Sequence, residues 1–379
     1  MTAISRRKFL LSSAGALALA QMKVSAIAKA LDDTGLKDAY KNDFLIGTAI
    51  SNGTLANNDT ALLSLISREF NAITAENCMK SGLIQPSQGQ WEWQLADRFI
   101  DFGTENNMTI VGHALVWHSQ APGDFFSNPD GSRISRDELV KRMDTHISTL
   151  MERYKGRVHI WDVVNEAIDE DRGWRRSPFF EIMGPEYMEY AFHLAHELDP
   201  TAHLIYNDYN MHDPAKREFL QNIIKDYRNR GVPIHGVGLQ GHVGLDWPDL
   251  EEFEKSIVTH AAEGMRIHVT EMDVDVLPVA WEYMGAEIST EFEYSDQLNP
   301  WSEKLPAEIE EKLTARYVEL FRLFLKHRDK IDRITTWGTH DGESWKNDFP
   351  VRGRTNYPLL FDRDLQPKPA HRALLGLPG

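Results

Sequence analysis

The sequence of 379 residues contains one cysteine, Cys78. An internal disulfide and a cysteine-rich metal site are therefore both excluded. An excess of basic residues is also missing, because 41 lysines and arginines face 57 acidic residues and the formal net charge is −16. Phosphate binding calls for a basic face, so we expect no nucleic-acid partner. Solubility is a sufficient reason for the acidic balance.

The N-terminus lacks an apolar run long enough to cross a membrane. The stretch from Phe9 to Ala20 has 12 residues, whereas a spanning helix needs about 20. This stretch follows the basic cluster Arg6-Arg7-Lys8 and precedes the small residues of "AIA", which end at Ala28. The pattern favours an export signal of the twin-arginine type over a membrane anchor. We expect residues 1–28 to be this signal and residues 29–379 to act in the periplasm or outside the cell, without a membrane anchor.

Eight short runs with strand character alternate with longer segments of helical period. The runs are "FLIGTAI" (44–50), "AITAEN" (72–77), "TIVGHALVWH" (109–118), "HIWDVVNE" (159–166), "HLIYNDYN" (203–210), "GVGLQGH" (236–242), "RIHVTEMDV" (266–274) and "RITTWGTHD" (333–341). A representative helical segment is 135–154, in which one apolar stripe contains Leu139, Met143, Ile147, Leu150 and Met151.

This number of strand–helix units predicts an α/β fold, a (β/α)8 TIM barrel, as a single domain over residues 29–379. The alternative is an open, doubly wound sheet. A glycine-rich phosphate loop after the first strand would support that alternative, and the sequence has none there.

Polar and aromatic side chains stand where the predicted strands end. In order along the chain they are Glu76, Asn77, His113, Trp117, His118, Asn165, Glu166, Asn207, Asp208, Tyr209, Gln240, His242, Glu271, Asp273, Trp337, His340 and Asp341. Barrel enzymes carry their functional groups at this C-terminal mouth. Buried charges cost several kcal/mol unless they are paired or solvated, so the ring of polar groups predicts an open polar cleft.

Glu166 and Glu271 end the fourth and seventh predicted strands. Two carboxyl groups are the minimum needed to cleave a glycosidic bond, and tryptophans offer flat faces to sugar rings. A metal-dependent barrel hydrolase would need a histidine-rich ligand set. The sequence has neither a His-x-His pair in the first run nor an H-E-x-x-H motif. We therefore expect no metal and no other cofactor.

Seven stretches resemble glycoside hydrolase family 10, the retaining endo-β-1,4-xylanases. They are "ENCMK", "GHALVWHSQ", "WDVVNEA", "YNDYN", "GLQGH", "TEMDV" and "WGTHDGESW", and the resemblance runs from about Phe44 to His371. It implies that xylan and xylo-oligosaccharides are the partners, that Glu166 is the general acid/base and that Glu271 is the nucleophile. For an acid, we expect the pKa of Glu166 to be raised by burial and by the nearby Glu271.

The resemblance also implies a set of substrate-binding residues. His242 would hydrogen-bond the nucleophile with Asp273 orienting it from behind, and Asn165 would hold the sugar 2-hydroxyl. The sugars before the scissile bond would be held by Glu76, Asn77, Lys80, His113, Trp117 and Gln240. Trp337 and Trp345 would form an aromatic lid, and Tyr209 would stack on the leaving-group side.

Several questions stay open in the sequence. A β-1,4-glucanase, or a mixed xylanase and cellulase, would share the catalytic pair, and a non-catalytic carbohydrate-binding protein is a more remote alternative. The family pattern is not followed at Thr339 and His340, where the last loop is expected to differ. The segment 277–306 is a long loop, whose aromatic residues either extend the cleft or pack the loop down. These residues are Trp281, Tyr283, Phe292, Tyr294 and Trp301.

Overall fold

The computed structural model describes residues 34–169, 173–278, 298–349 and 352–378. The expected export signal, residues 1–28, lies outside the described residues. Among the described residues, no helix combines the length and the apolar character that crossing a membrane requires.

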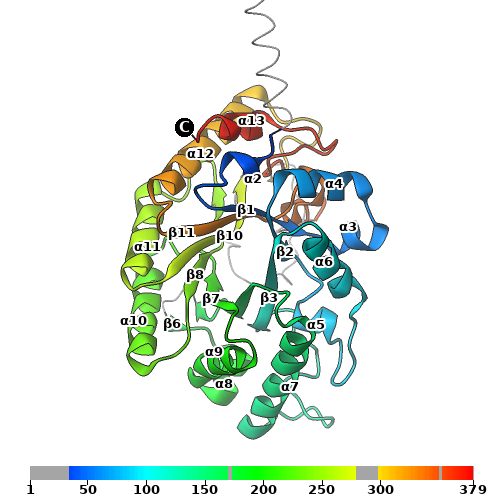
Figure 1. The fold of residues 1–379 in the computed structure, drawn as a ribbon, viewed down its shortest axis with the longest axis vertical. Helices are drawn as coiled ribbons and strands as arrows, with labels where there is room; N and C mark the ends of the chain where they lie inside the picture. Colours follow the sequence, from blue (N-terminus) through cyan, green and yellow to red (C-terminus); the bar gives the residue numbers. More distant parts are fainter. Residues whose placement is uncertain (1–33, 170–172, 279–297, 350–351, 379) are drawn as a thin grey trace, which may run out of the picture.

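Eight parallel strands close into a barrel (Figure 1). They are β1 (Leu45–Ile50), β2 (Ala72–Ala75), β3 (Thr109–Trp117), β4 (Ile160–Asn165), β7 (His203–Asp208), β8 (Gly236–Leu239), β10 (Arg266–Asp275) and β11 (Ile331–Thr336). Each pairs with the next, and β11 pairs with β1 to close the ring. The predicted (β/α)8 barrel is confirmed, and the open sheet is excluded because such a sheet leaves two edges unpaired.

The largest differences between predicted runs and observed strands occur in the runs 236–242 and 333–341. The run 236–242 divides into β8 and β9 (His242–Gly244), and β9 pairs with the C-terminal part of β10. The run 333–341 leaves the sheet after Thr336, and its last residue opens the short 3₁₀ helix η3 (Asp341–Glu343). Both differences lie at the C-terminal mouth of the barrel.

Helices surround the barrel and fill the connections between strands (Figure 1). They are α2 (Leu36–Ala39), α3 (Asn52–Asn57), α4 (Thr60–Glu69), α5 (Ser81–Ile84), α6 (Gln94–Glu105), α7 (Arg136–Tyr154), α8 (Pro178–Met183), α9 (Glu186–Leu198), α10 (Pro214–Arg230), α11 (Leu250–Ala262), α12 (Ala307–Lys326) and α13 (Pro369–Leu375). A short hairpin of β5 (Ile168–Asp169) and β6 (Gly173–Trp174) follows β4, and the 3₁₀ helix η4 (Trp345–Asn347) follows η3.

Helix α7 shows how local sequence sets an element and its packing. The hydroxyl of Ser135 accepts a hydrogen bond from the backbone N–H of Glu138 at 3.2 Å, which caps the N-terminus. Asp137 and Glu138 lie in the first turn, where negative charge is favoured by the helix dipole. The predicted apolar stripe is buried against the barrel along its whole length.

The strands pack on both faces. Leu204 and Trp161 point outward to the helices, whereas Val111, Ile160 and Ile205 form a separate buried cluster on β3, β4 and β7. Alternation along a strand sends successive side chains to opposite faces, so this second cluster fills the inside of the barrel.

Candidate active site

A cavity of about 480 Å³ lies at the C-terminal ends of the strands. It is lined by every residue that the sequence predicted for catalysis or substrate binding, namely Glu76, Asn77, Lys80, His113, Trp117, Asn165, Glu166, Tyr209, Gln240, His242, Glu271, Trp337 and Trp345. These residues come from separate strands and loops, so the barrel alone brings them together. The predicted supporting residue, Asp273, lies behind the cavity wall and is fully buried.

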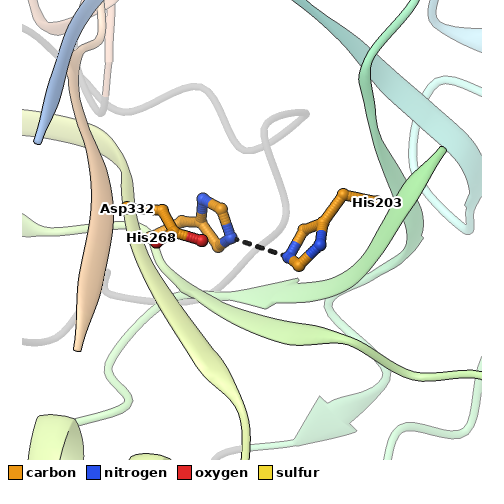
Figure 2. Close-up of side chains that lie close together, drawn as sticks. All are labelled: His203, His268 and Asp332. Carbon is orange, nitrogen blue, oxygen red and sulfur yellow. Dashed lines mark hydrogen bonds between the residues drawn. The ribbon is translucent and has the colours of Figure 1, made fainter. Parts of the chain in front are cut away.

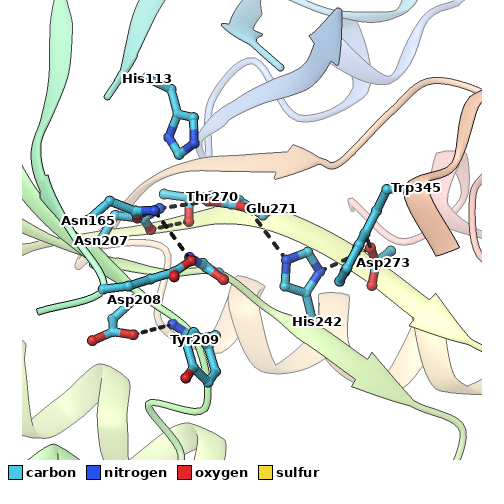
Figure 3. A network of polar contacts seen from close by, with 12 residues as sticks. His113, Asn165, Asn207, Asp208, Tyr209, His242, Thr270, Glu271, Asp273 and Trp345 are labelled. Atoms are coloured by element: carbon cyan, nitrogen blue, oxygen red, sulfur yellow. Dashed lines mark hydrogen bonds and ion pairs between the residues drawn. The ribbon is translucent and has the colours of Figure 1, made fainter. Parts of the chain in front are cut away.

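Glu271 is held on both of its carboxylate oxygens (Figure 3). The side-chain amide of Asn207 donates to Oε1 at 2.7 Å, and Nε2 of His242 lies 3.4 Å from Oε2. The hydroxyl of Thr270 donates to the amide oxygen of Asn207 at 2.6 Å, which turns the amide nitrogen toward Glu271. The carboxylate is therefore fixed in one orientation.

His242 connects Glu271 to a second carboxylate. Its Nδ1 lies 3.0 Å from Oδ2 of Asp273, which also accepts a 2.8 Å hydrogen bond from the indole N–H of Trp345. Burial lowers the pKa of His242, but the charges of Asp273 and Glu271 outweigh burial and raise it to about 9. A positive imidazolium therefore stands between two carboxylates at neutral pH.

Glu166 has a different environment. The amide of Gln240 donates to Oε1 at 3.0 Å, and the indole N–H of Trp117 donates to Oε2 at 3.0 Å. Burial raises the pKa of Glu166, but these hydrogen bonds and the positive His118 and Arg175 more than offset burial, so the pKa lies below its ordinary value. The expectation of a raised pKa was wrong for this structure, because it weighed burial and Glu271 without the donors that favour the carboxylate.

The backbone of Glu166 adopts an uncommon conformation. Its φ is +56°, in the left-handed region that a residue with a side chain seldom occupies. Its N–H donates to the carbonyl of Asn207 at 2.9 Å, and its own carbonyl accepts from Nε of Arg175 at 2.8 Å. Arg175 also donates to the hydroxyl of Tyr209 at 2.8 Å. Contacts on both sides of the peptide therefore hold Glu166 in the conformation that presents its carboxyl group to the cavity.

Lys80 lines the same cavity and is almost fully buried. Its ammonium group donates to the amide oxygen of Asn77 at 2.9 Å and lies 5.0 Å from the ring of Trp117 and 5.9 Å from that of Trp337. Burial lowers its pKa, which the charge of Glu76 opposes. A cationic donor framed by aromatic rings suits a ligand that has both hydroxyl groups and apolar faces.

Sequence reasoning missed three residues that hold the predicted ones in place. Asn207 was noticed at a strand end but not selected, although it bonds the carboxylate of Glu271. Asp162 was overlooked, and its Oδ2 lies 2.7 Å from Nδ1 of His113. An acidic residue inside an apolar strand was the available signal for Asp162. Arg175 gave none, because its contacts depend on how the hairpin after β4 folds.

The structure describes the long loop after β10 only in part. Trp301 is half-buried, and its carbonyl accepts a 2.9 Å hydrogen bond from the hydroxyl of Tyr357. Trp301 packs against the main core and does not line the cavity described above, so it has the packing role. The other aromatic residues of the hypothesis lie outside the described residues, namely Trp281, Tyr283, Phe292 and Tyr294.

A closed (β/α)8 barrel with two buried carboxyl groups and tryptophans around one mouth has the architecture of a glycoside hydrolase. Comparison with known families supports this class, because the sequence model of glycosyl hydrolase family 10 matches residues 35–376 of this chain. The chain belongs to glycosyl hydrolase family 10.

Individual relatives are similar over nearly their whole length. Endo-1,4-beta-xylanase A of Xylanibacter ruminicola is 39% identical over 361 residues, which cover 95% of this chain and 97% of the relative. Endo-1,4-beta-xylanase of Geobacillus stearothermophilus is 40% identical, and the aligned region covers 88% of this chain and 96% of that relative. Among solved structures, a family 10 endoxylanase from a sugarcane soil metagenome is 53% identical, with a TM-score of 0.88, and covers 90% of this chain and 100% of its own.

Proposed function

We propose that this protein is an endo-1,4-β-xylanase that cleaves internal bonds of xylan by double displacement with retention of configuration. The observation that carries the proposal is the unequal environment of two glutamates in one cavity. Glu271 contacts an amide donor and the imidazolium of His242, whereas Glu166 accepts hydrogen bonds from the neutral donors Gln240 and Trp117, with the charges of His118 and Arg175 nearby. Retaining glycosidases require one carboxylate that stays ionised and one that exchanges a proton.

In the first step, a carboxylate oxygen of Glu271 attacks the anomeric carbon while the carboxyl group of Glu166 protonates the departing glycosidic oxygen. The covalent glycosyl-enzyme is then hydrolysed by water, which gives its proton to Glu166. This mechanism predicts a separation of about 5 to 5.5 Å between the two carboxyl groups. His242 holds one carboxylate oxygen of Glu271 in place, with its Nε2 3.4 Å from Oε2.

Glu166 has to hold a proton for the first step, although its pKa lies below its ordinary value in this structure. The donors Gln240 and Trp117 both line the cavity, within reach of a bound sugar. When their N–H groups turn from Glu166 to sugar hydroxyls, the ionised form loses two hydrogen bonds and its pKa rises. Substrate binding thereby prepares the acid.

Substrate preference is assigned to the pocket bounded by Trp337 and Trp345. An indole wall leaves little space for the hydroxymethyl group that distinguishes glucose from xylose. One such group changes affinity by about 1 to 3 kcal/mol, so a preference of roughly 10- to 200-fold for xylose is expected. Replacing Trp345 by Ala should reduce this preference, whereas a glucanase would lose activity on both sugars alike.

The test compares linear β-1,4-xylo-oligosaccharides with the matching cello-oligosaccharides, with the product anomer followed by NMR. Wild type should release β-anomeric xylo products, and Glu271→Ala should lose all turnover. Glu308→Ala, which alters an exposed glutamate at the start of α12, serves as the matched control and should behave as wild type. Preferred cleavage of cello-oligosaccharides would favour a glucanase, and binding without turnover would favour a carbohydrate-binding protein.

A second substrate separates the roles of the two glutamates. Dinitrophenyl β-xylobioside has a leaving group that departs without protonation. Glu166→Ala should therefore release dinitrophenol rapidly in the first turnover, before the glycosyl-enzyme waits for hydrolysis. On xylo-oligosaccharides the same variant should lose about 10²- to 10⁴-fold, the range typical of a general acid. A first turnover slowed equally on both substrates would contradict the assignment of Glu166 as the acid.

Export rests on the N-terminal sequence alone. We expect the pair Arg6-Arg7 to direct the folded chain through the twin-arginine pathway, with cleavage after Ala28. Replacing both arginines with lysine should leave the precursor in the cytoplasm, as fractionation would detect. Export of the double variant at the wild-type rate would argue against this pathway.

A further inference from the structure

Figure 2 shows a second cluster of polar side chains, made of His203, His268 and Asp332. His203 is the first residue of β7, His268 the third of β10 and Asp332 the second of β11. These positions are near the N-terminal ends of parallel strands, whereas Glu166 follows the last residue of β4 and Glu271 is the sixth residue of β10. The cluster is therefore separate from the cleft, and the proposed hydrolysis does not use it.

The two imidazoles face each other through the same ring atom. Nε2 of His203 lies 3.2 Å from Nε2 of His268, and one ligand atom of each of the three residues lies within 4.8 Å of the others. Two nitrogens bound to one tetrahedral zinc ion, each about 2.0 to 2.1 Å from it, are separated by about 3.3 Å. The observed separation of the two nitrogens therefore matches the distance in a shared zinc site.

We propose that His203, His268 and Asp332 form a binding site for a divalent cation of the zinc class, with water as the fourth ligand. Two imidazole nitrogens and one carboxylate oxygen are a donor set that zinc accepts in tetrahedral geometry. The site joins three strands of the barrel, so a bound ion would brace its N-terminal end.

Neighbouring residues leave the site open and hold its ligands. Gly236 on β8 lies between β7 and β10, and a Cβ atom there would come 3.0 Å from Nε2 of His203. Arg266 reaches Asp332 through two N–H donors, Nε at 2.8 Å and Nη2, and both contact the same oxygen, Oδ1. Arg266 therefore orients the carboxylate of Asp332 through Oδ1. His203 and Asp332 are only half-buried, which gives an ion a path from solvent.

A simple hydrogen bond between the two neutral rings is the competing explanation for the short contact. In that arrangement one Nε2 carries a proton and donates to the other, and the pair has no affinity for metal. The two explanations differ in whether the purified protein binds zinc with one-to-one stoichiometry, which a direct titration measures.

The experiment uses the whole secreted chain without an affinity tag, stripped with EDTA and titrated with Zn²⁺ against a chromogenic chelator. Wild type should bind one equivalent, and His203→Gln and Asp332→Asn should each weaken binding at least about tenfold. His193→Gln removes an exposed histidine on α9 as the matched control and should leave the affinity unchanged. Failure of the wild type to bind, or equal affinity in all variants, would overturn the proposal.

Cobalt gives a reading that does not depend on any variant folding. Co²⁺ in a tetrahedral site with nitrogen ligands absorbs visible light much more strongly than octahedral Co²⁺ on a protein surface. Wild type with one equivalent of Co²⁺ should show the intense bands, and weak octahedral bands would overturn the proposal. Stripped and zinc-loaded enzyme should hydrolyse xylo-oligosaccharides equally well, but the loaded form should unfold at a higher temperature.

Discussion

From the contact between His242 and Asp273 we predict how far the variant Asp273→Asn changes the pKa of His242. In the structure the pKa of His242 is raised from 6.5 to about 9, with Asp273 the largest favourable influence. At 1.36 kcal/mol per pH unit, this corresponds to about 3 kcal/mol of preference for the protonated ring. Asparagine keeps the shape and a hydrogen-bond acceptor but removes the charge. The pKa of His242 should then fall toward or below 6.5, because burial is no longer opposed by Asp273.

Activity should report this change in the alkaline limb of its pH profile. With dinitrophenyl β-xylobioside the protonation of Glu166 does not matter, so kcat/KM depends on Glu271 and on the charge of His242. Wild type should lose activity only as the pH rises through about 9, whereas Asp273→Asn should lose it around pH 6 to 7. Trp345→Phe is the matched control, because it removes a hydrogen bond to Asp273 and leaves the charge in place.

Stability should follow the same titration. A histidine whose pKa is raised by folding contributes fully below its unfolded value of 6.5, and the contribution is lost as the pH rises through about 9. The free energy of unfolding of the wild type should therefore fall by up to about 3 kcal/mol over this window, measured by urea denaturation. Asp273→Asn should show little of this fall. Identical alkaline limbs and identical pH dependence of stability in the two proteins would refute the reasoning.

Two further predictions concern the second glutamate and the barrel wall. Gln240→Leu removes a hydrogen bond to the ionised form of Glu166, which should raise the pKa of Glu166. The alkaline limb of the pH profile of kcat/KM on xylo-oligosaccharides should therefore move up by about 1 pH unit, and a limb that moves down would contradict this reasoning. Gly112→Ala places a Cβ atom 2.1 Å from the ring of Trp161, so it should lower the free energy of unfolding by about 3 kcal/mol or more. The control Gly123→Ala should lower it by less than about 0.5 kcal/mol, because no atom lies within 4 Å of the added Cβ atom. Equal stability of these two alanine variants would contradict the packing argument.

Much of the fold was determined by the sequence itself. The apolar runs and the stripe of α7 predicted the eight barrel strands and the packing face of that helix, because side-chain period reports directly which face is buried. The polar residues near strand ends predicted the lining of the cleft, because parallel strands bring their C-terminal ends together at one mouth of the barrel.

Tertiary structure alone decided the electrostatics of that cleft. The sequence placed Glu166 and Glu271 at strand ends, but the direction of the pKa of Glu166 depended on where the N–H groups of Gln240 and Trp117 point. The contact between His203 and His268 likewise forms only when the barrel closes, because the two residues are 65 positions apart along the chain. Periodicity records the burial of each residue, whereas a pKa or a ligand set depends on distances of about 3 Å between strands, which exist only once the barrel has closed.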